Sequence, residues 1–200
     1  EHTVTEEVTG IDIVQAQILI EEGKTLAEAT GVARQEDVML NGHALQCRVT
    51  TEDPLNNFIP DYGRLTAYRS ATGNGIRLDG GTAYAGGVIT RYYDSLLVKV
   101  TAWAPTAAET IQRMDRALRE FRIRGVATNL QFLENLINHP AFVDDQKNEL
   151  TTRFIENTPE LLAFAARRDR ASKMLRFLAE VAVHGNPEVT GRTLPALPLP

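Results

Sequence analysis

Three short clusters of polar residues contain the side chains that could carry chemistry in this 200-residue chain. Residues 1–6 hold two carboxylates and an imidazole, residues 46–54 place a Cys-Arg pair before Glu-Asp-Pro, and residues 91–99 place Tyr-Asp-Ser between an arginine and a lysine. Carboxylates and imidazoles are common general bases, and a guanidinium can bind an oxyanion through two parallel hydrogen bonds. Taken singly, the first cluster is better explained as a solvated turn than as a site, the second is also explained as a cross-strand ion pair, and the third as a strand with exposed polar residues.

Composition argues against several classes of function. The net charge of −5 is unlike the basic surface of general nucleic-acid-binding proteins. No apolar run approaches the roughly 20 residues that cross a bilayer. The single cysteine cannot form an internal disulfide, and the four histidines lack the spacing of metal ligands. We therefore expect no nucleic-acid partner, no membrane segment and no metal site within this chain.

Strands are predicted in the middle of the chain, where they would position two of the three clusters. Residues 43–51 alternate in type, which predicts a strand closed by Glu-Asp-Pro. Residues 64–100 predict a series of hairpins separated by glycines, with residues 91–103 as the clearest strand. Because neighbouring strand residues point to opposite faces, we expect Cys47 to lie in the core and Arg48 to point away from it.

Helices are predicted before and after this strand-rich region. Capping-box spacings predict helices that begin at Thr9, Thr106 and Thr128. A proline at the favoured first position predicts another that begins with Thr158-Pro159. Apolar residues at helical spacing predict a last helix over residues 171–182. The pattern as a whole is that of an α+β protein.

In this order and at these spacings, the three clusters resemble the signature of biotin carboxylases of the ATP-grasp superfamily. That signature runs Glu-His-x-Val-Thr-Glu, then Gly-His-Ala-x-x-Cys-Arg-x-x-x-Glu-Asp-Pro, then Tyr-Asp-Ser before a hydrophobic strand. It matches residues 1–6, 42–54 and 93–95. The resemblance implies an α+β fold: the C-terminal subdomain of an ATP-grasp biotin carboxylase, an antiparallel sheet flanked by helices, followed by helices of a linker or regulatory region.

The C-terminal part narrows the resemblance and implies a division into domains. Residues 151–155, 158–161 and 179–185 resemble the pyruvate carboxylase family, in which the chain passes from the biotin carboxylase domain into a connecting region. The implied boundaries are residues 1–155 for the C-terminal part of the biotin carboxylase domain, 156–186 for a helical connecting or allosteric region, and 187–200 for a proline-rich linker.

The resemblance also implies roles for residues of the three clusters. Glu1 takes the place of the base that removes the proton of bicarbonate, and Arg48 takes the place of the residue that stabilises the biotin enolate. His2, Glu52 and Asp94 are implied as secondary residues on the biotin and bicarbonate side. Asp94 would orient an arginine and Glu52 would be a structural ion partner, whereas His2 is equally well explained as a packed histidine.

Two further groups of residues are implied by the same resemblance. Asn74 and Arg77 lie in the stretch that forms the twofold contact between biotin carboxylase domains. Residues 167–176 contain five basic side chains, which most often form a solvated helix face. In pyruvate carboxylases, however, arginines near this junction suit the phosphates of the activator acetyl-CoA. The candidates are Arg122 and Arg124, expected in a turn between two helices, together with Arg167 and Arg170.

The implied activity is ATP- and bicarbonate-dependent carboxylation of biotin, followed in the whole enzyme by carboxylation of pyruvate to oxaloacetate. Biotin would be attached to a carrier domain elsewhere, and the ligands of ATP and Mg²⁺ would precede Glu1, so the isolated chain is expected to be inactive. The family suggests a homotetramer, cytoplasmic in bacteria and mitochondrial in eukaryotes. Two alternatives stay open: a biotin carboxylase subunit of acetyl-CoA or propionyl-CoA carboxylase, and a non-catalytic assembly or regulatory fragment.

Overall fold

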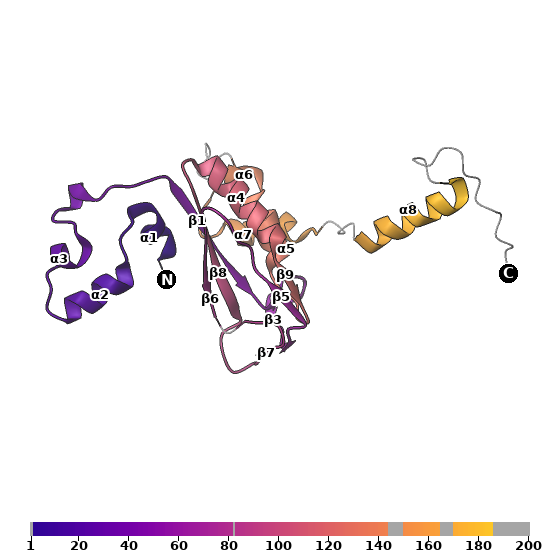
Figure 1. Cartoon of the computed structure of the whole chain (residues 1–200), viewed down its shortest axis with the longest axis horizontal. Helices are drawn as coiled ribbons and strands as arrows, with labels where there is room; N and C mark the ends of the chain where they lie inside the picture. Colours follow the sequence, from indigo (N-terminus) through magenta and orange to yellow (C-terminus); the bar gives the residue numbers. More distant parts are fainter. Residues whose placement is uncertain (1, 82, 144–149, 165–169, 186–200) are drawn as a thin grey trace. The chain divides into compact units, whose positions relative to one another are not determined.

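The computed structural model describes residues 2–81, 83–143, 150–164 and 170–185 (Figure 1). Contacts divide the chain into two units, Glu1–Phe164 and Ala165–Pro200. The described residues of the second unit, 170–185, contain the helix α8 (Arg170–His184). No helix in the described residues is long and apolar enough to cross a membrane.

The first unit is built around a three-stranded antiparallel sheet in the order β1-β8-β6 (Figure 1). Its strands are β1 (His43–Thr50), β8 (Leu96–Ala104) and β6 (Ile76–Gly80). Three two-stranded ribbons extend from it. They pair β2 (Glu52–Asp53) with β3 (Ile59–Pro60), β4 (Gly63–Arg64) with β7 (Val88–Ile89), and β5 (Ala67–Arg69) with β9 (Arg122–Arg124).

Along the chain, helices precede β1 and follow β8. Those before β1 are α1 (Thr3–Thr9), α2 (Ile13–Glu21) and α3 (Leu26–Thr30), followed by the short 3₁₀ turn η1 (Gln35–Asp37). A second 3₁₀ turn, η2 (Pro54–Asn56), follows β2. Those after β8 are α4 (Ala107–Glu120), α5 (Leu130–Ile137), α6 (Pro140–Val143), α7 (Phe154–Asn157) and the 3₁₀ turn η4 (Pro159–Leu162).

One face of the sheet is apolar and packs against α4 and α5. Cys47 and Val49 of β1 lie in a buried cluster that includes Val100 of β8, Met114 of α4 and Leu133 of α5. This pattern follows from the two-residue period of a strand, which places alternate side chains of β1 on the same face. Burial of each large apolar side chain of this kind contributes about 2 kcal/mol of hydrophobic stabilisation. The predicted core position of Cys47 is therefore confirmed.

The opposite face of the sheet is polar and carries α1. Gln46 of β1 is paired in register with Thr101 of β8, and Thr101 is paired with Arg77 of β6. The buried Thr3 of α1 lies on this row: its Oγ1 is 3.0 Å from Gln46 Oε1 and 2.7 Å from Thr101 Oγ1. Glu6, one turn further along α1, is bonded to Arg77. Hydrogen bonds thus take the place of apolar packing where α1 meets the sheet.

Helix α4 begins where the sequence predicts, whereas α2 begins a few residues later than predicted. The start at Thr106 is confirmed, since its Oγ1 accepts a hydrogen bond from the N–H of Glu109, although the Glu109 side chain bonds the hydroxyl of Thr106 and not its backbone N–H. The start at Thr9 is wrong: Thr9 ends α1, Gly10 follows in the left-handed conformation (φ 70°), and Asp12 caps α2 instead. Asp is as good a cap as Thr, so the spacing alone could not choose between them.

Other boundaries shifted by a few residues. The start at Thr128 is wrong by one position, because Asn129 is the residue that precedes α5. The strand predicted over residues 91–103 begins only at Leu96, since the side chain of Asp94 accepts the N–H of Leu96 at 3.1 Å and forms a turn. The helix predicted at Thr158-Pro159 is a single 3₁₀ turn.

The core position of Cys47 predicts that its thiol is inert in the folded chain. Burial raises the pKa of the Cys47 thiol to about 12, so almost no thiolate exists at pH 8. A thiol-alkylating reagent should leave the native chain unlabelled and should label it completely in denaturant, as measured by mass spectrometry. Rapid labelling of the native chain would contradict the burial of this residue.

Candidate functional site

Arg48 and Asp94, predicted from separate clusters, meet at the end of β1. Arg48 lies on the opposite face of β1 from Cys47 and is exposed, and its Nη2 lies 3.5 Å from Asp94 Oδ2. Both side chains remain more than half exposed, at 58% and 66%, so their attraction adds little stability. The contact leaves most donors of the guanidinium directed to solvent, where a ligand can reach them.

Glu52 joins this pair through Ser95. The hydroxyl of Ser95 donates a 2.6 Å hydrogen bond to Glu52 Oε1, and it lies 3.5 Å from Asp94 Oδ1. The N–H of Thr51 donates to the carbonyl of Ser95 at 2.9 Å, which ties the same two segments together through the backbone. Among the described residues Glu52 forms no ion pair, so its expectation as an ion partner is corrected: its partner is a hydroxyl.

A bulge in the β1–β8 ladder lies beside Arg48. Arg48 is opposite Lys99 and Val49 is opposite Val98, but Thr50 is opposite Leu96, so Leu97 is an extra residue in β8. Thr50 is buried, and its hydroxyl has no hydrogen-bond partner among the described residues.

The first cluster lies on the same polar face of the sheet as Arg48. Thr3 bonds to Gln46, which is two residues before Arg48 and therefore on the same side of β1. His2 is exposed and precedes α1 without capping it. Glu1 lies outside the described residues, so its predicted role as a base stays a prediction. The structure thus gathers residues of all three clusters around one face.

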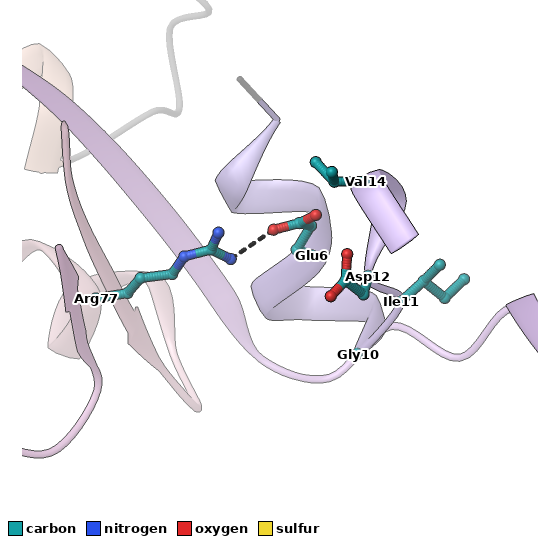
Figure 2. A pocket seen from close by; sticks show the side chains of 6 residues that line it. All are labelled: Glu6, Gly10, Ile11, Asp12, Val14 and Arg77. Atoms are coloured by element: carbon teal, nitrogen blue, oxygen red, sulfur yellow. Dashed lines mark hydrogen bonds and ion pairs between the residues drawn. The ribbon is translucent and has the colours of Figure 1, made fainter. Parts of the chain in front are cut away.

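Arg77 is held by three carboxylates of its own unit. Its Nη1 lies 2.6 Å from Glu6 Oε2 (Figure 2). The same atom lies 3.6 Å from Glu7 Oε1, while Nε and Nη2 donate to Asp79 at 2.9 Å and 3.0 Å. The hydrogen bonds to Asp79, opposed by partial burial and reinforced by Glu6, raise the pKa of the Arg77 guanidinium. Its predicted place in a contact between carboxylase domains stays a prediction, as does that of Asn74, which is exposed in the preceding turn.

Glu6 is the acidic partner that links α1 to this arginine. Partial burial alone would raise the pKa of Glu6, but hydrogen bonds from Arg77 and from the N–H of Ile13, with the charge of Arg77, outweigh it and lower that pKa. A small surface pocket lies beside this pair, lined also by Gly10, Ile11, Asp12 and Val14 (Figure 2). Its carboxylates are already bonded within the chain, and the described residues contain no cluster able to hold a metal ion.

The arginines proposed for an effector lie in two different units. Arg122 and Arg124 form the ends of strand β9, so the turn expected there between two helices is wrong. Arg69 of β5, which the sequence did not single out, is directly opposite Arg122. All three side chains are exposed, and none has a carboxylate partner among the described residues. Arg167 lies outside the described residues, and only the backbone of Arg170, the first residue of α8, is described.

Residues 46–157 match the family described as the biotin carboxylase C-terminal domain. This match covers more than half of the chain, including Arg48, Glu52 and Asp94. The chain belongs to this family. Its fold, helices around small antiparallel sheets, agrees with solved biotin carboxylase domains. The match ends seven residues before the end of the first unit, Phe164, and the predicted domain boundaries stay predictions.

Curated relatives and solved structures are similar along nearly the whole chain. The chain is 48% identical to pyruvate carboxylase of Bacillus subtilis over 100% of its length, and 52% identical to that of Aspergillus terreus over 93%. It covers only 17% and 15% of those two proteins. A pyruvate carboxylase of Rhizobium etli, solved with the allosteric activator acetyl coenzyme A, is 65% identical with a TM-score of 0.79, covering 100% of this chain and 20% of that one.

A more distant solved structure shows the same fold. The biotin carboxylase domain of 2-oxoglutarate carboxylase from Hydrogenobacter thermophilus is 38% identical, with a TM-score of 0.75. The similarity covers 83% of this chain and 35% of that one. Similarity to pyruvate carboxylases thus continues through the C-terminal residues, whereas this relative matches a smaller part of the chain.

The Glu6–Arg77 pair predicts a pH-dependent contribution to stability. Because folding lowers the pKa of Glu6, its contribution is present above about pH 4.5 and is lost as the pH falls through the folded-state pKa. Glu6→Gln should destabilise the chain at pH 7 and should make its free energy of unfolding less dependent on pH below 4.5, as measured by urea denaturation. Glu21→Gln, at an exposed carboxylate of α2, is the control. An unchanged pH dependence in Glu6→Gln would contradict the pairing.

Proposed function

We propose that this chain is part of the ATP- and bicarbonate-dependent biotin carboxylation site of a pyruvate carboxylase, which carboxylates pyruvate to oxaloacetate. The proposal is supported by membership of the biotin carboxylase C-terminal domain family. It is also supported by curated relatives, named pyruvate carboxylase, that are 48% and 52% identical to the chain. Because the chain covers 17% of the Bacillus subtilis relative, we assign the ligands of ATP and Mg²⁺ and the biotin carrier to other parts of a longer protein.

The setting of Arg48 is the observation that carries this proposal. Its guanidinium is exposed at the end of a paired strand, with one carboxylate partner, Asp94, at 3.5 Å. When bound, biotin supplies a ureido nitrogen that accepts the carboxyl group and a ureido oxygen that gains negative charge in the process. The planar fork of Arg48 can donate two parallel hydrogen bonds to that oxygen. A cation already fixed in place stabilises the charge without reorganisation.

Asp94, Ser95 and Glu52 support this role by orienting the fork. Asp94 accepts the N–H of Leu96 and lies beside Arg48, so it cannot swing freely away from the guanidinium. Ser95 links the same loop to Glu52. The three residues form a continuous polar chain that ends at Arg48. Catalytic fork geometry of this kind depends on supporting hydrogen bonds around it.

Glu1 is proposed to act on the other substrate, bicarbonate. A carboxylate within hydrogen-bond reach can remove its proton, which makes it a better nucleophile towards the terminal phosphate of ATP. This proposal is supported by Thr3, two residues later, which is anchored to Gln46 on the face that carries Arg48. His2, between them, is exposed and available as a neighbour of the substrate.

Acetyl-CoA is proposed as an effector that binds through arginines. The solved Rhizobium etli pyruvate carboxylase is described with this activator. Arg69 and Arg122 are opposite each other on the β5–β9 ribbon. Like charges directly opposite in a sheet repel each other, and an anion between them relieves that repulsion. We assign phosphate binding to Arg69, Arg122 and Arg124, with Arg167 and Arg170 as further candidates.

Assembly and location follow the same proposal. We assign Asn74 and Arg77 to the contact between paired carboxylase domains of a homotetramer. Asn74 is exposed in the turn before β6, which leaves it accessible to a second copy. The protein would lie in the cytoplasm of a bacterium or in the mitochondrion of a eukaryote. No observation favours the carboxylase subunits of acetyl-CoA or propionyl-CoA carboxylase over this assignment.

Arg48→Lys in the complete carboxylase tests the central assignment. Lysine keeps the charge but lacks the two-donor fork, so we expect the rate of carboxylation of free biotin to fall about 100-fold. The rate is measured with radioactive bicarbonate. Arg64→Lys is the matched control, because the only hydrogen bond of the Arg64 side chain among the described residues goes to the carbonyl of Gly86, and a lysine can also donate to it. Near-normal carboxylation by Arg48→Lys would overturn the proposal.

Arg124→Glu tests the effector assignment. Reversing an exposed charge without a carboxylate partner should raise the acetyl-CoA concentration needed for half-activation roughly tenfold, because a charge-assisted hydrogen bond is lost. The basal rate without acetyl-CoA should stay unchanged. Lys24→Glu, at an exposed lysine between α2 and α3, is the control. Equal losses of basal and activated rate would leave Arg124 with a structural role only.

A further inference from the structure

Asn129 pairs with the free edge of β1 at the position of Arg48. Strand β1 is at the edge of the sheet, so its outer peptide groups have no strand partner. The Nδ2 of Asn129 donates to the carbonyl of Arg48 at 2.9 Å, and its Oδ1 accepts the N–H of Thr50 at 3.0 Å. The backbone N–H of Asn129 also donates to the carbonyl of Thr50 at 3.3 Å. One residue thus satisfies three edge groups of β1.

This use of Asn129 departs from the common role of an asparagine before a helix. Asn129 immediately precedes α5, where asparagine normally accepts a hydrogen bond from the first turn of its own helix. No such bond forms here, because both ends of the carboxamide are directed to β1. Asn129 is 7% exposed, so water does not compete for these bonds. Helix α5 therefore has no side-chain cap, and the Asn129 carboxamide instead forms a bridge between the peptide groups of Arg48 and Thr50.

This carboxamide bridge lies where the hydrogen-bond ladder between β1 and β8 is irregular. The β1–β8 register shifts between Val49 and Thr50, so the ladder is irregular one residue after Arg48. Bulges re-aim the side chains beside them. A catalytic side chain must be held within about 0.5 Å and 10–20° of its productive geometry, which the irregular ladder alone does not ensure. The carboxamide spans this irregularity, from the peptide of Arg48 to that of Thr50.

We infer that Asn129 is a positioning residue for Arg48: it fixes the backbone from which the guanidinium is aimed at the biotin ureido oxygen. The inference rests on the proposed role of Arg48 in biotin carboxylation. Asn129 is far from Arg48 in the sequence and does not touch the guanidinium in any hydrogen bond of the described residues. It acts through the backbone, so it need not contact biotin.

Asn129→Asp in the complete carboxylase tests this inference. Aspartate has nearly the same shape and is an equally good residue before a helix, and it can still accept the N–H of Thr50. It cannot donate to the carbonyl of Arg48, and it places a negative oxygen against it. We expect kcat/KM for free biotin to fall 10- to 100-fold, while bicarbonate-dependent ATP cleavage without biotin changes less than twofold.

Asn135→Asp is the matched control. Asn135 lies on α5, the helix that Asn129 precedes, and its Nδ2 also donates to backbone carbonyls, those of Leu161 and Ala163, at 2.9 Å and 3.3 Å. The substitution removes the same type of hydrogen bond from α5, but away from Arg48. We expect both partial reactions to remain within twofold of the wild type. If Asn135→Asp lowers biotin carboxylation as much as Asn129→Asp does, the effect is a general one of α5, and the inference is overturned.

Asn129→Ser provides a second variant if the aspartate impairs folding. Serine also suits the position before a helix, but it is too short to reach both peptide groups of β1. It should reproduce the loss in biotin carboxylation with ATP cleavage preserved. Equal loss of both partial reactions in the two variants would show a role in folding rather than in positioning, and would overturn the inference.

A double-mutant cycle separates this inference from the proposed function. If Asn129 acts through Arg48, the variant with both Arg48→Lys and Asn129→Asp should be no slower than Arg48→Lys alone, because the fork to be aimed is already absent. Multiplied losses would overturn the inference. If Arg48→Lys impairs carboxylation and Asn129→Asp does not, only the inference fails. If Arg48→Lys is itself harmless, the proposed function fails, whatever Asn129→Asp does.

Discussion

The antiparallel pairing of β1 with β8 is the interaction on which the rest of the structure depends. It sets Cys47 opposite Val100 and Arg48 opposite Lys99, which sends the first pair to the core and the second to the polar face. Because the side-chain period of a strand is two, a slip of one residue would exchange the two faces. The packing of α4 and α5 on the apolar side therefore also fixes which side carries Arg48.

The polar face of the sheet binds helix α1 through hydrogen bonds and an ion pair. Helix α1 is attached there by hydrogen bonds of the buried Thr3 and by the ion pair of Glu6 with Arg77, not by an apolar stripe. Buried polar contacts are costly when any partner is lost, so they allow few alternative arrangements. This specificity brings the first cluster to the face of the second and third. The site is thus gathered by the same bonds that hold α1 in place.

Local patterns predicted much of the fold, and long-range contacts account for what they missed. Alternation predicted β1, and the Thr106 capping box predicted α4, because both signals lie within a few residues. The β5–β9 ribbon joins Arg69 to Arg122 across more than fifty residues, and no local signal indicates such a pairing. The resemblance singled out Arg48 and Asp94, but only the structure shows that Ser95 links Asp94 to Glu52.

Asn129 shows most clearly why the remaining part of the site could not be predicted. The capping-box spacing predicted the start of the helix at Thr128, so no local signal singled out Asn129. In the structure its carboxamide instead bonds the peptides of Arg48 and Thr50. In the proposed role the Arg48 guanidinium has to be held in one direction while most of its donors stay open to a ligand, and Asp94 contacts only one of those donors. The hydrogen bonds of Asn129 fix the backbone of β1 at Arg48, and they leave the other donors of the guanidinium open to a ligand.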